Sequence, residues 1–136
     1  MTDIIDHIPQ KKPILLVDGF LGISDDGISR TRLTIEASNI FLDGRKFSAC
    51  GMIEHMAQSA AARKSWMNRL EGKPDKEGYI GSLSGFEMIS DVCLNDTVET
   101  ELEILQELGN MSMVEVRSFV NGVLVAKGRL GIVIAE

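Results

Sequence analysis

The chain has 136 residues, of which 44% are hydrophobic and 25% charged, the composition of an ordinary globular protein. This length fits one domain over residues 1–136 and is short for two. The formal net charge of −6 argues against nucleic acid or an anionic membrane surface as a partner, because both attract basic proteins.

Cysteine and histidine usage excludes further classes. Cys50 and Cys93 are far apart and form no CxxC pair, which favours reduced thiols over a disulfide framework. The two histidines show no metal-ligand spacing, so we expect no metal site and no cofactor.

The stretch "MTDIIDHIPQ" lacks the apolar core of a signal peptide, and runs such as "GIVIA" are too short to cross a bilayer. We therefore predict a cytoplasmic protein.

The first elements expected along the chain are two strands. The apolar run "PILLVDGFLGI", residues 13–23, indicates an early strand. Side chains alternate in "ISRTRLTIEA", residues 28–37, which is typical of a half-buried strand with one face in water. The residues expected on its buried face are Thr31, Leu33, Ile35 and Ala37.

A long helix follows, from about Ser48 to Leu70. Ser48 is a suitable N-cap, and Gly72 followed by Pro74 is a strong stop signal. Apolar residues recur at helical spacing, and those predicted to share one stripe are Ile53, Met56, Ala57, Ala60, Ala61 and Met67.

Four more strands are expected after the helix. The segment 79–88 is the first, and in "TVETELEIL", residues 97–105, apolar residues alternate with glutamates. Strands near 113–120 and 123–135 flank Asn121-Gly122, a strong hairpin signal, and "ELGN" supplies the preceding turn. This order predicts an α+β fold in which an antiparallel sheet buries one long helix against its concave face.

Three separated stretches resemble the FabZ-type 3-hydroxyacyl-acyl-carrier-protein dehydratases. These are "IPQKKPILLVD" near the start, the helix segment "IEHMAQSAA", and "GFEMISDVCLNDTVETELEI" followed by "VNGVLVAKGRLGI". The resemblance covers nearly the whole chain. It implies the hotdog fold, in which a curved antiparallel sheet wraps a long helix and subunits pair into homodimers or larger assemblies. It also implies an acyl-thioester substrate, carried by acyl carrier protein or coenzyme A, as in fatty acid biosynthesis.

Two departures from the family pattern stand out. The family's Leu-Pro-His motif has a histidine where this chain has Gln10, and a carboxamide cannot exchange protons near neutral pH. The loop before the helix, "FLDGRKFSACGMIE", is shorter than the usual version and resembles dehydratase-like proteins of aryl-polyene pathways. Gly51 is then the nearest candidate for the glycine whose N–H meets the thioester carbonyl.

Glu54 is the residue on which the chemistry is expected to depend. Elimination of water needs a base for the C2 proton, an acid for the 3-hydroxyl, and a donor for the thioester oxygen. Glu54 lies near the helix start among small residues, where a substrate tunnel could meet the helix. In this hypothesis Glu54 and Gln10 are the catalytic residues, and the expected substrate-contacting residues are Gly51, Cys50 and Gln58.

Other reactive residues have plainer interpretations. A small buried thiol is the favoured interpretation of Cys50. His7 should lie about 10 Å from Gln10 along an extended strand, and His55 should point about 100° round the helix from Glu54. For both histidines a surface or dimer-contact position is favoured over a catalytic one.

Three functions remain open from the sequence. The first is a hydro-lyase that dehydrates 3-hydroxyacyl thioesters, with Glu54 carrying most of the proton transfer. The second is an acyl thioesterase that relies on Glu54 and needs no histidine at position 10. The third is a non-catalytic subunit of a mixed dimer with a dehydratase homologue, in which Gln10 marks a decayed site.

Overall fold

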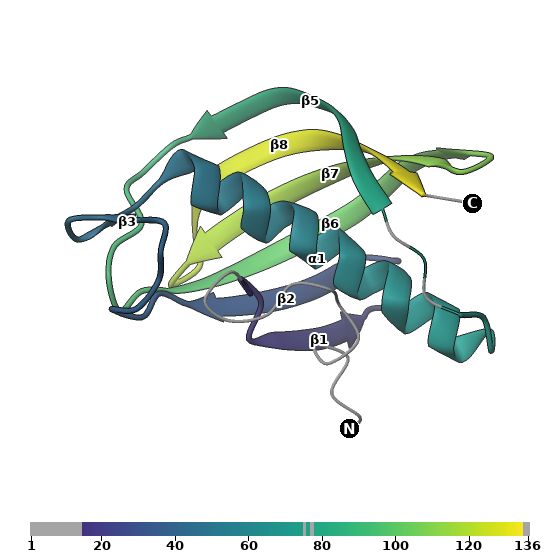
Figure 1. Ribbon diagram of the computed structural model, residues 1–136, viewed down its shortest axis with the longest axis horizontal. Helices are drawn as coiled ribbons and strands as arrows, with labels where there is room; N and C mark the ends of the chain where they lie inside the picture. Colours follow the sequence, from purple (N-terminus) through teal and green to yellow (C-terminus); the bar gives the residue numbers. More distant parts are fainter. Residues whose placement is uncertain (1–14, 75, 77, 135–136) are drawn as a thin grey trace.

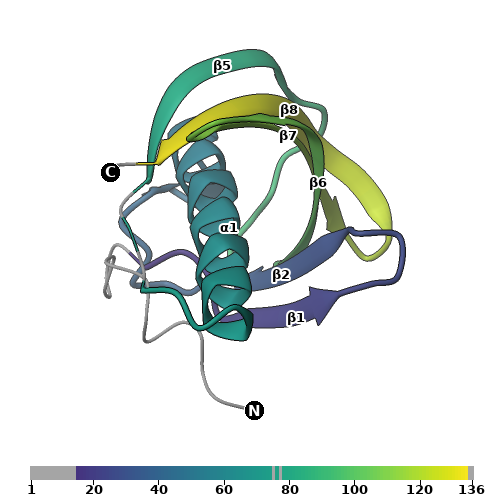
Figure 2. The same cartoon turned by 90° about the vertical axis from the view of Figure 1, so that its right-hand side faces the viewer.

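The computed structural model describes residues 15–74, 76 and 78–134, and its central feature is one helix held inside a curved sheet. The helix α1 runs from Ala49 to Leu70. Figure 1 shows α1 crossing the inner face of the sheet, and Figure 2 shows the sheet curling around it. A single long helix wrapped by an antiparallel sheet is the hotdog arrangement, so the predicted α+β architecture is confirmed.

The sheet has six antiparallel strands in the order β1-β2-β6-β7-β8-β5. Its strands are β1 (Gly19–Ile23), β2 (Ser29–Thr34), β6 (Thr97–Leu108), β7 (Met111–Val120), β8 (Val123–Ile134) and β5 (Gly78–Met88). A separate two-stranded hairpin consists of β3 (Leu42–Asp43) and β4 (Lys46–Phe47), just before the helix. β1 and β5 are therefore the two edges of the main sheet.

The ends of α1 follow the local signals in the sequence. Ser48 is the N-cap, and its hydroxyl oxygen accepts a hydrogen bond from the Gly51 N–H at 3.0 Å. Gly72 adopts a φ of +70°, a conformation that glycine takes at little steric cost, and the helix has ended two residues earlier. In the part of the chain that the structure describes, no helix combines the length and apolarity needed to span a membrane.

Turn residues fix the register of the last two strands. Asn121 and Gly122 have φ values of 51° and 77°, and the two positive angles match the tight turn predicted from this dipeptide. Val120 and Val123 then face each other across the hairpin, as do Phe119 and Leu124. An irregularity between Ser118 and Phe119 then shifts the register, and Ser118 pairs with Ala126.

The core forms where the inner side chains of the sheet meet α1. Leu33, Val98 and Leu102 are buried on β2 and β6, as the alternating pattern predicts. They pack in one cluster with Met52 and Met56 of the helix, neither of which is exposed to solvent. Burial of these apolar side chains provides the main driving force for closing the sheet on the helix.

The helix is rotated from the orientation that its apolar stripe predicts. Met56 and Ala60 are buried, but Ile53, Ala57 and Ala61 are only half-buried. The buried face instead includes the polar residues His55, Gln58 and Ser59. Hydrogen bonds to the sheet and to the segment before β1, rather than apolar spacing alone, decide which side of α1 faces the core.

Two further expectations about strands are wrong. The first strand begins at Gly19 rather than at residue 13, because residues 15–18 are not in strand conformation. In this segment Leu16 contacts side chains of α1, and the Asp18 N–H donates to the Arg32 carbonyl oxygen at 2.7 Å. Ala37 is exposed, since β2 ends at Thr34 before the predicted alternation does. The β3–β4 hairpin was not predicted, although Asp43-Gly44 carries a turn signal and Gly44 has a φ of +62°.

Substitutions within β6 test the position of the core. Leu102 is 1% exposed and Leu105 is 43% exposed on the same strand. We expect Leu102→Ala to lower the free energy of unfolding by about 2–5 kcal/mol because it leaves a cavity beside the helix. Leu105→Ala is the matched control, with an expected effect of about 0.5 kcal/mol in the same urea denaturation experiment. Equal losses would contradict the assignment of the inner face.

Candidate functional site

Glu54 lies on a side of α1 that the sheet covers incompletely. Its side chain is half-buried, and its neighbours on the helix surface are small or apolar. Cys50 and Ala57 occupy positions one turn before and about one turn after it on that face. Ile53 and Ala61 extend the same face, and none of these four residues is fully buried. The Glu54 carboxyl therefore lies in a strip of small and apolar side chains on α1 that the sheet covers only in part.

Gln58 holds the Glu54 carboxyl from one turn further along α1. Its amide nitrogen donates to Glu54 Oε1 at 3.2 Å, while its carbonyl oxygen accepts from the Leu16 N–H at 2.6 Å. Gln58 is itself 1% exposed, so its amide is fixed within packed protein. The second oxygen of Glu54, Oε2, has no hydrogen-bond partner among the described residues. One carboxyl oxygen is thus oriented and the other is left available.

Gly51 has a packing role that the sequence did not reveal. A Cβ at this position would lie 2.6 Å from Cβ of Phe41 and 2.7 Å from the ring of Phe47, which is too close for a real contact. The Gly51 N–H is engaged by the Ser48 hydroxyl. Among the described residues, the helix-start N–H groups without an acceptor are those of Ala49 and Cys50.

The remaining expected site residues fall in different places. Cys50 is exposed, so the interpretation of it as a small buried thiol is wrong. Its position in the first turn points it away from the core, although its neighbours Gly51 and Met52 are buried. Gln10 and His7 lie outside the described residues. The structure therefore brings together Glu54, Gln58 and the first turn of α1.

His55, which follows Glu54 on α1, lies in a position that the sequence analysis did not predict. It has no exposure to solvent, which overturns the expectation of a surface or dimer-contact histidine. Its Nδ1 lies 2.6 Å from the Leu16 carbonyl oxygen and its Nε2 lies 2.7 Å from Thr100 Oγ1. Burial lowers the pKa of His55 to about 4, outweighing the opposing effects of the Leu16 hydrogen bond and the Asp18 charge.

Thr100 and Ser118 complete this buried cluster, and the sequence analysis did not single them out. Their hydroxyl oxygens are 2.7 Å apart on directly paired positions of β6 and β7. A signal was available: Thr100 stands between the inward residues Val98 and Leu102, where a polar side chain needs a buried partner.

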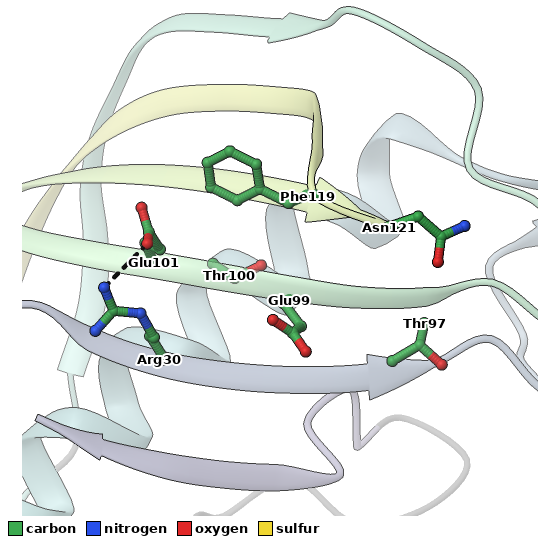
Figure 3. A pocket seen from close by; sticks show the side chains of 8 residues that line it. Arg30, Thr97, Glu99, Thr100, Glu101, Phe119 and Asn121 are labelled. Carbon is green, nitrogen blue, oxygen red and sulfur yellow. Dashed lines mark hydrogen bonds and ion pairs between the residues drawn. The ribbon is translucent and has the colours of Figure 1, made fainter.

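A hollow lies on the outer face of the sheet, to which Glu99 and Glu101 point (Figure 3). It measures about 360 Å³, and across it Arg30 donates to Glu101 at 3.1 Å. Its charged walls do not suit an apolar acyl chain, and Glu54 does not line it. Among the described residues no cluster of three or more histidine, cysteine or acidic side chains is placed to hold a metal ion.

The ApeP-like family, described as ApeP dehydratase, matches this chain over residues 2–135. Among curated proteins, the 3-hydroxyacyl-acyl-carrier-protein dehydratase FabZ of Lactococcus lactis subsp. cremoris (strain SK11) is 26% identical over 133 residues. That alignment covers 96% of this chain and 91% of the relative. The match therefore extends over the site just described as well as over the sheet.

Solved structures show the same fold. The dehydratase heterocomplex ApeI:P from Xenorhabdus doucetiae superposes with a TM-score of 0.90 at 15% identity, covering 100% of this chain and 93% of that chain. A hypothetical thioesterase with coenzyme A from Streptococcus pneumoniae TIGR4 gives 0.66 at 13% identity, covering 85% of this chain and 84% of that chain. The hotdog fold is thus shared by proteins that are named for different activities, a dehydratase and a thioesterase.

The buried imidazole predicts a pH dependence of stability. In the unfolded chain the pKa of His55 has its ordinary value of 6.5, whereas the folded protein binds the proton only below about pH 4. The contribution of neutral His55 to the free energy of unfolding is therefore complete above pH 6.5 and decreases as the pH falls toward 4. The expected total loss is about 3 kcal/mol.

Urea denaturation between about pH 7 and pH 4 measures this effect. In His55→Asn no group titrates at this position, so the pH dependence should be shallower than in the wild type. Because carboxylates contribute equally to both proteins, only the difference between the two slopes reports on His55. Parallel slopes would contradict the buried neutral state.

Proposed function

The chain belongs to the ApeP-like dehydratase family, and from that membership we propose that it acts in the dehydration of 3-hydroxyacyl thioesters, with Glu54 as acid and base. The observation that carries the proposal is the held carboxyl of Glu54 on a small-residue face of α1 that the sheet leaves open. A carboxyl that lies among small and apolar side chains and is oriented by a buried amide is a candidate for a functional role.

Glu54 can supply both proton transfers of the elimination. Its carboxylate removes the C2 proton, and the C2–H electron pair forms the double bond to C3 as the C3–O bond breaks. The carboxyl then gives its proton to the departing hydroxyl, which leaves as water, so Glu54 returns to its starting state. Gln58 fixes Oε1, which leaves Oε2 to face the substrate from one side, as a syn elimination requires.

The first turn of α1 supplies the remaining requirement. The N–H groups of Ala49 and Cys50 lack acceptors among the described residues, and the positive end of the helix lies there. Cys50 is one turn before Glu54, so a thioester oxygen bound at its N–H would place the acyl carbons near the carboxyl. Gly51, the first candidate for this contact, already donates to Ser48.

A second subunit is expected to close this site along the edge of the sheet. β5 is an edge strand eleven residues long, and Tyr79, Ile80 and Leu83 on it are exposed. Long apolar edge strands are templates for pairing with another chain. Pairing through β5 would extend the sheet and cover apolar surface beside the helix, which supports a dimer as the functional unit.

The second candidate is that the partner is a homologue that carries the missing histidine. Gln10 cannot exchange a proton, which removes one acid–base group from a homodimer. The ApeI:P structure is described as a dehydratase heterocomplex, a precedent for a chain of this fold in a mixed assembly. In a mixed dimer, this chain would contribute Glu54 and the partner would contribute the imidazole.

Glu54→Gln tests the chemical role. We expect the rate of enoyl thioester formation to fall by about 10²–10⁴-fold, because the amide cannot accept or return the C2 proton. The assay uses a 3-hydroxyacyl chain on acyl carrier protein, with product identified by mass spectrometry. It is run on this protein alone and on a mixture with a histidine-bearing homologue from the same cell.

Glu99→Gln is the matched control, since Glu99 is exposed on the outer face of the sheet. Turnover by the protein alone would support a self-sufficient enzyme, and turnover only in the mixture would support the mixed dimer. Turnover in the mixture that Glu54→Gln leaves unchanged would identify a non-catalytic subunit and contradict the role of Glu54. Release of free thiol without enoyl product would instead favour the thioesterase.

Charged substitutions on exposed leucines test the subunit contact. Leu83 on β5 and Leu105 on β6 are 41% and 43% exposed, so they are matched in residue type and accessibility. We expect Leu83→Lys to shift the molecular mass in light scattering toward the monomer, because a charge would be buried at the paired edge. Leu105→Lys should leave the mass unchanged. The opposite ranking would place the contact elsewhere.

A further inference from the structure

A chain of buried hydrogen bonds crosses the core and ends at Glu54. Its members come from β7, β6, α1 and the segment before β1, and their exposure is 1% or less at Ser118, Thr100, His55 and Leu16. Consecutive polar atoms lie 2.6 or 2.7 Å apart from the Ser118 hydroxyl to the Leu16 carbonyl oxygen. Buried polar groups of this kind are costly unless every one is satisfied, so the chain is a specific feature of this core.

The direction of each hydrogen bond can be assigned. The Leu16 carbonyl oxygen can only accept, so Nδ1 of His55 must carry a proton. Because burial keeps the imidazole neutral, Nε2 then has none and accepts from the Thr100 hydroxyl. The Thr100 oxygen in turn accepts from the Ser118 hydroxyl. All three bonds therefore donate in the same sense, from β7 toward the segment before β1.

Leu16 connects this chain of hydrogen bonds to the candidate site. The Leu16 N–H donates to Gln58 Oε1, so both polar backbone atoms of Leu16 are held by side chains of α1. This contact also fixes the orientation of the Gln58 amide, since a flipped amide would set its NH₂ group against the Leu16 N–H. With the oxygen directed at Leu16, the NH₂ group is directed at Glu54 Oε1.

We propose that His55 is a positioning residue for the Glu54 carboxyl, acting through the backbone of Leu16 and the amide of Gln58. This inference rests on the proposed dehydratase role of Glu54. His55 and Gln58 hold the backbone of one residue from two successive turns of the helix, so that backbone and the helix cannot shift independently. If His55 is lost, the Leu16 carbonyl oxygen loses its donor from α1, so the Leu16 N–H that orients the Gln58 amide is held less firmly.

Enzyme kinetics separate this role from simple support of the fold. In the active assembly, we expect His55→Leu to lower kcat by about a hundredfold with KM within about twofold, because the carboxyl is misplaced rather than the substrate lost. His55→Asn should recover most of that rate, because its side-chain N–H can donate to the Leu16 carbonyl in place of Nδ1–H.

Met56→Ala is the control for loss of stability alone. Met56 is fully buried next to His55 and has no hydrogen bond in the chain described above. At a temperature where each variant is folded by circular dichroism, Met56→Ala should retain kcat within about twofold. Equal losses of kcat in Met56→Ala and His55→Leu, or no recovery in His55→Asn, would overturn the positioning role.

NMR spectroscopy tests the inference without an activity assay. Nitrogen-15 NMR of the wild-type protein near neutral pH should show His55 protonated at Nδ1 and bare at Nε2, and the Leu16 amide should exchange slowly with solvent. In His55→Leu that amide should exchange faster, and His55→Asn should restore its protection. An Nε2-protonated His55, or a Leu16 amide unaffected by His55→Leu, would overturn the inference. Confirmed NMR signatures without turnover in any assembly would reject the dehydratase role of Glu54, and with it any positioning for catalysis.

Discussion

Pairing of buried polar groups between α1 and its surroundings is the constraint on which this structure depends. His55, Gln58 and Ser59 point from the helix into the core, and each has a hydrogen-bond partner there. Those partners belong to β6, to Leu16 and to β2, so they surround the helix from several sides. A rotation of α1 would leave several of them unsatisfied at once, whereas apolar contacts alone would tolerate it better.

The rotation of the helix determines what the rest of its surface presents. Because His55 faces the core, Glu54 is turned about 100° away from it, toward the incompletely covered strip. The strip carries Cys50, Ala57 and Ala61, whose side chains are small and not fully buried. In the proposed mechanism, the placement of Glu54 depends on packing on the opposite side of α1, where His55 and Gln58 both contact Leu16.

This chain has Gln10 where the family pattern has a histidine, but it keeps the hydrogen-bonded carboxyl of Glu54. The acidic half of the site is held by hydrogen bonds within the described residues, since Gln58 donates to Glu54 and Leu16 donates to Gln58. A decayed site has no need of such support, because a solvated carboxylate satisfies itself in water. These contacts support the proposal that this chain contributes a carboxyl to an assembly whose second acid–base group comes from a partner.

Local interactions explain which predictions the structure confirmed. The helix from Ala49 to Leu70 follows from Ser48 and Gly72, and the last hairpin follows from Asn121-Gly122, because these residues act through backbone conformations close in sequence. Which face of α1 is buried, the position of His55 and the packing need for Gly51 were settled only by tertiary structure. They depend on Leu16, Thr100, Phe41 and Phe47, which are distant in sequence or on other elements, and no periodicity in one segment records where another segment will lie.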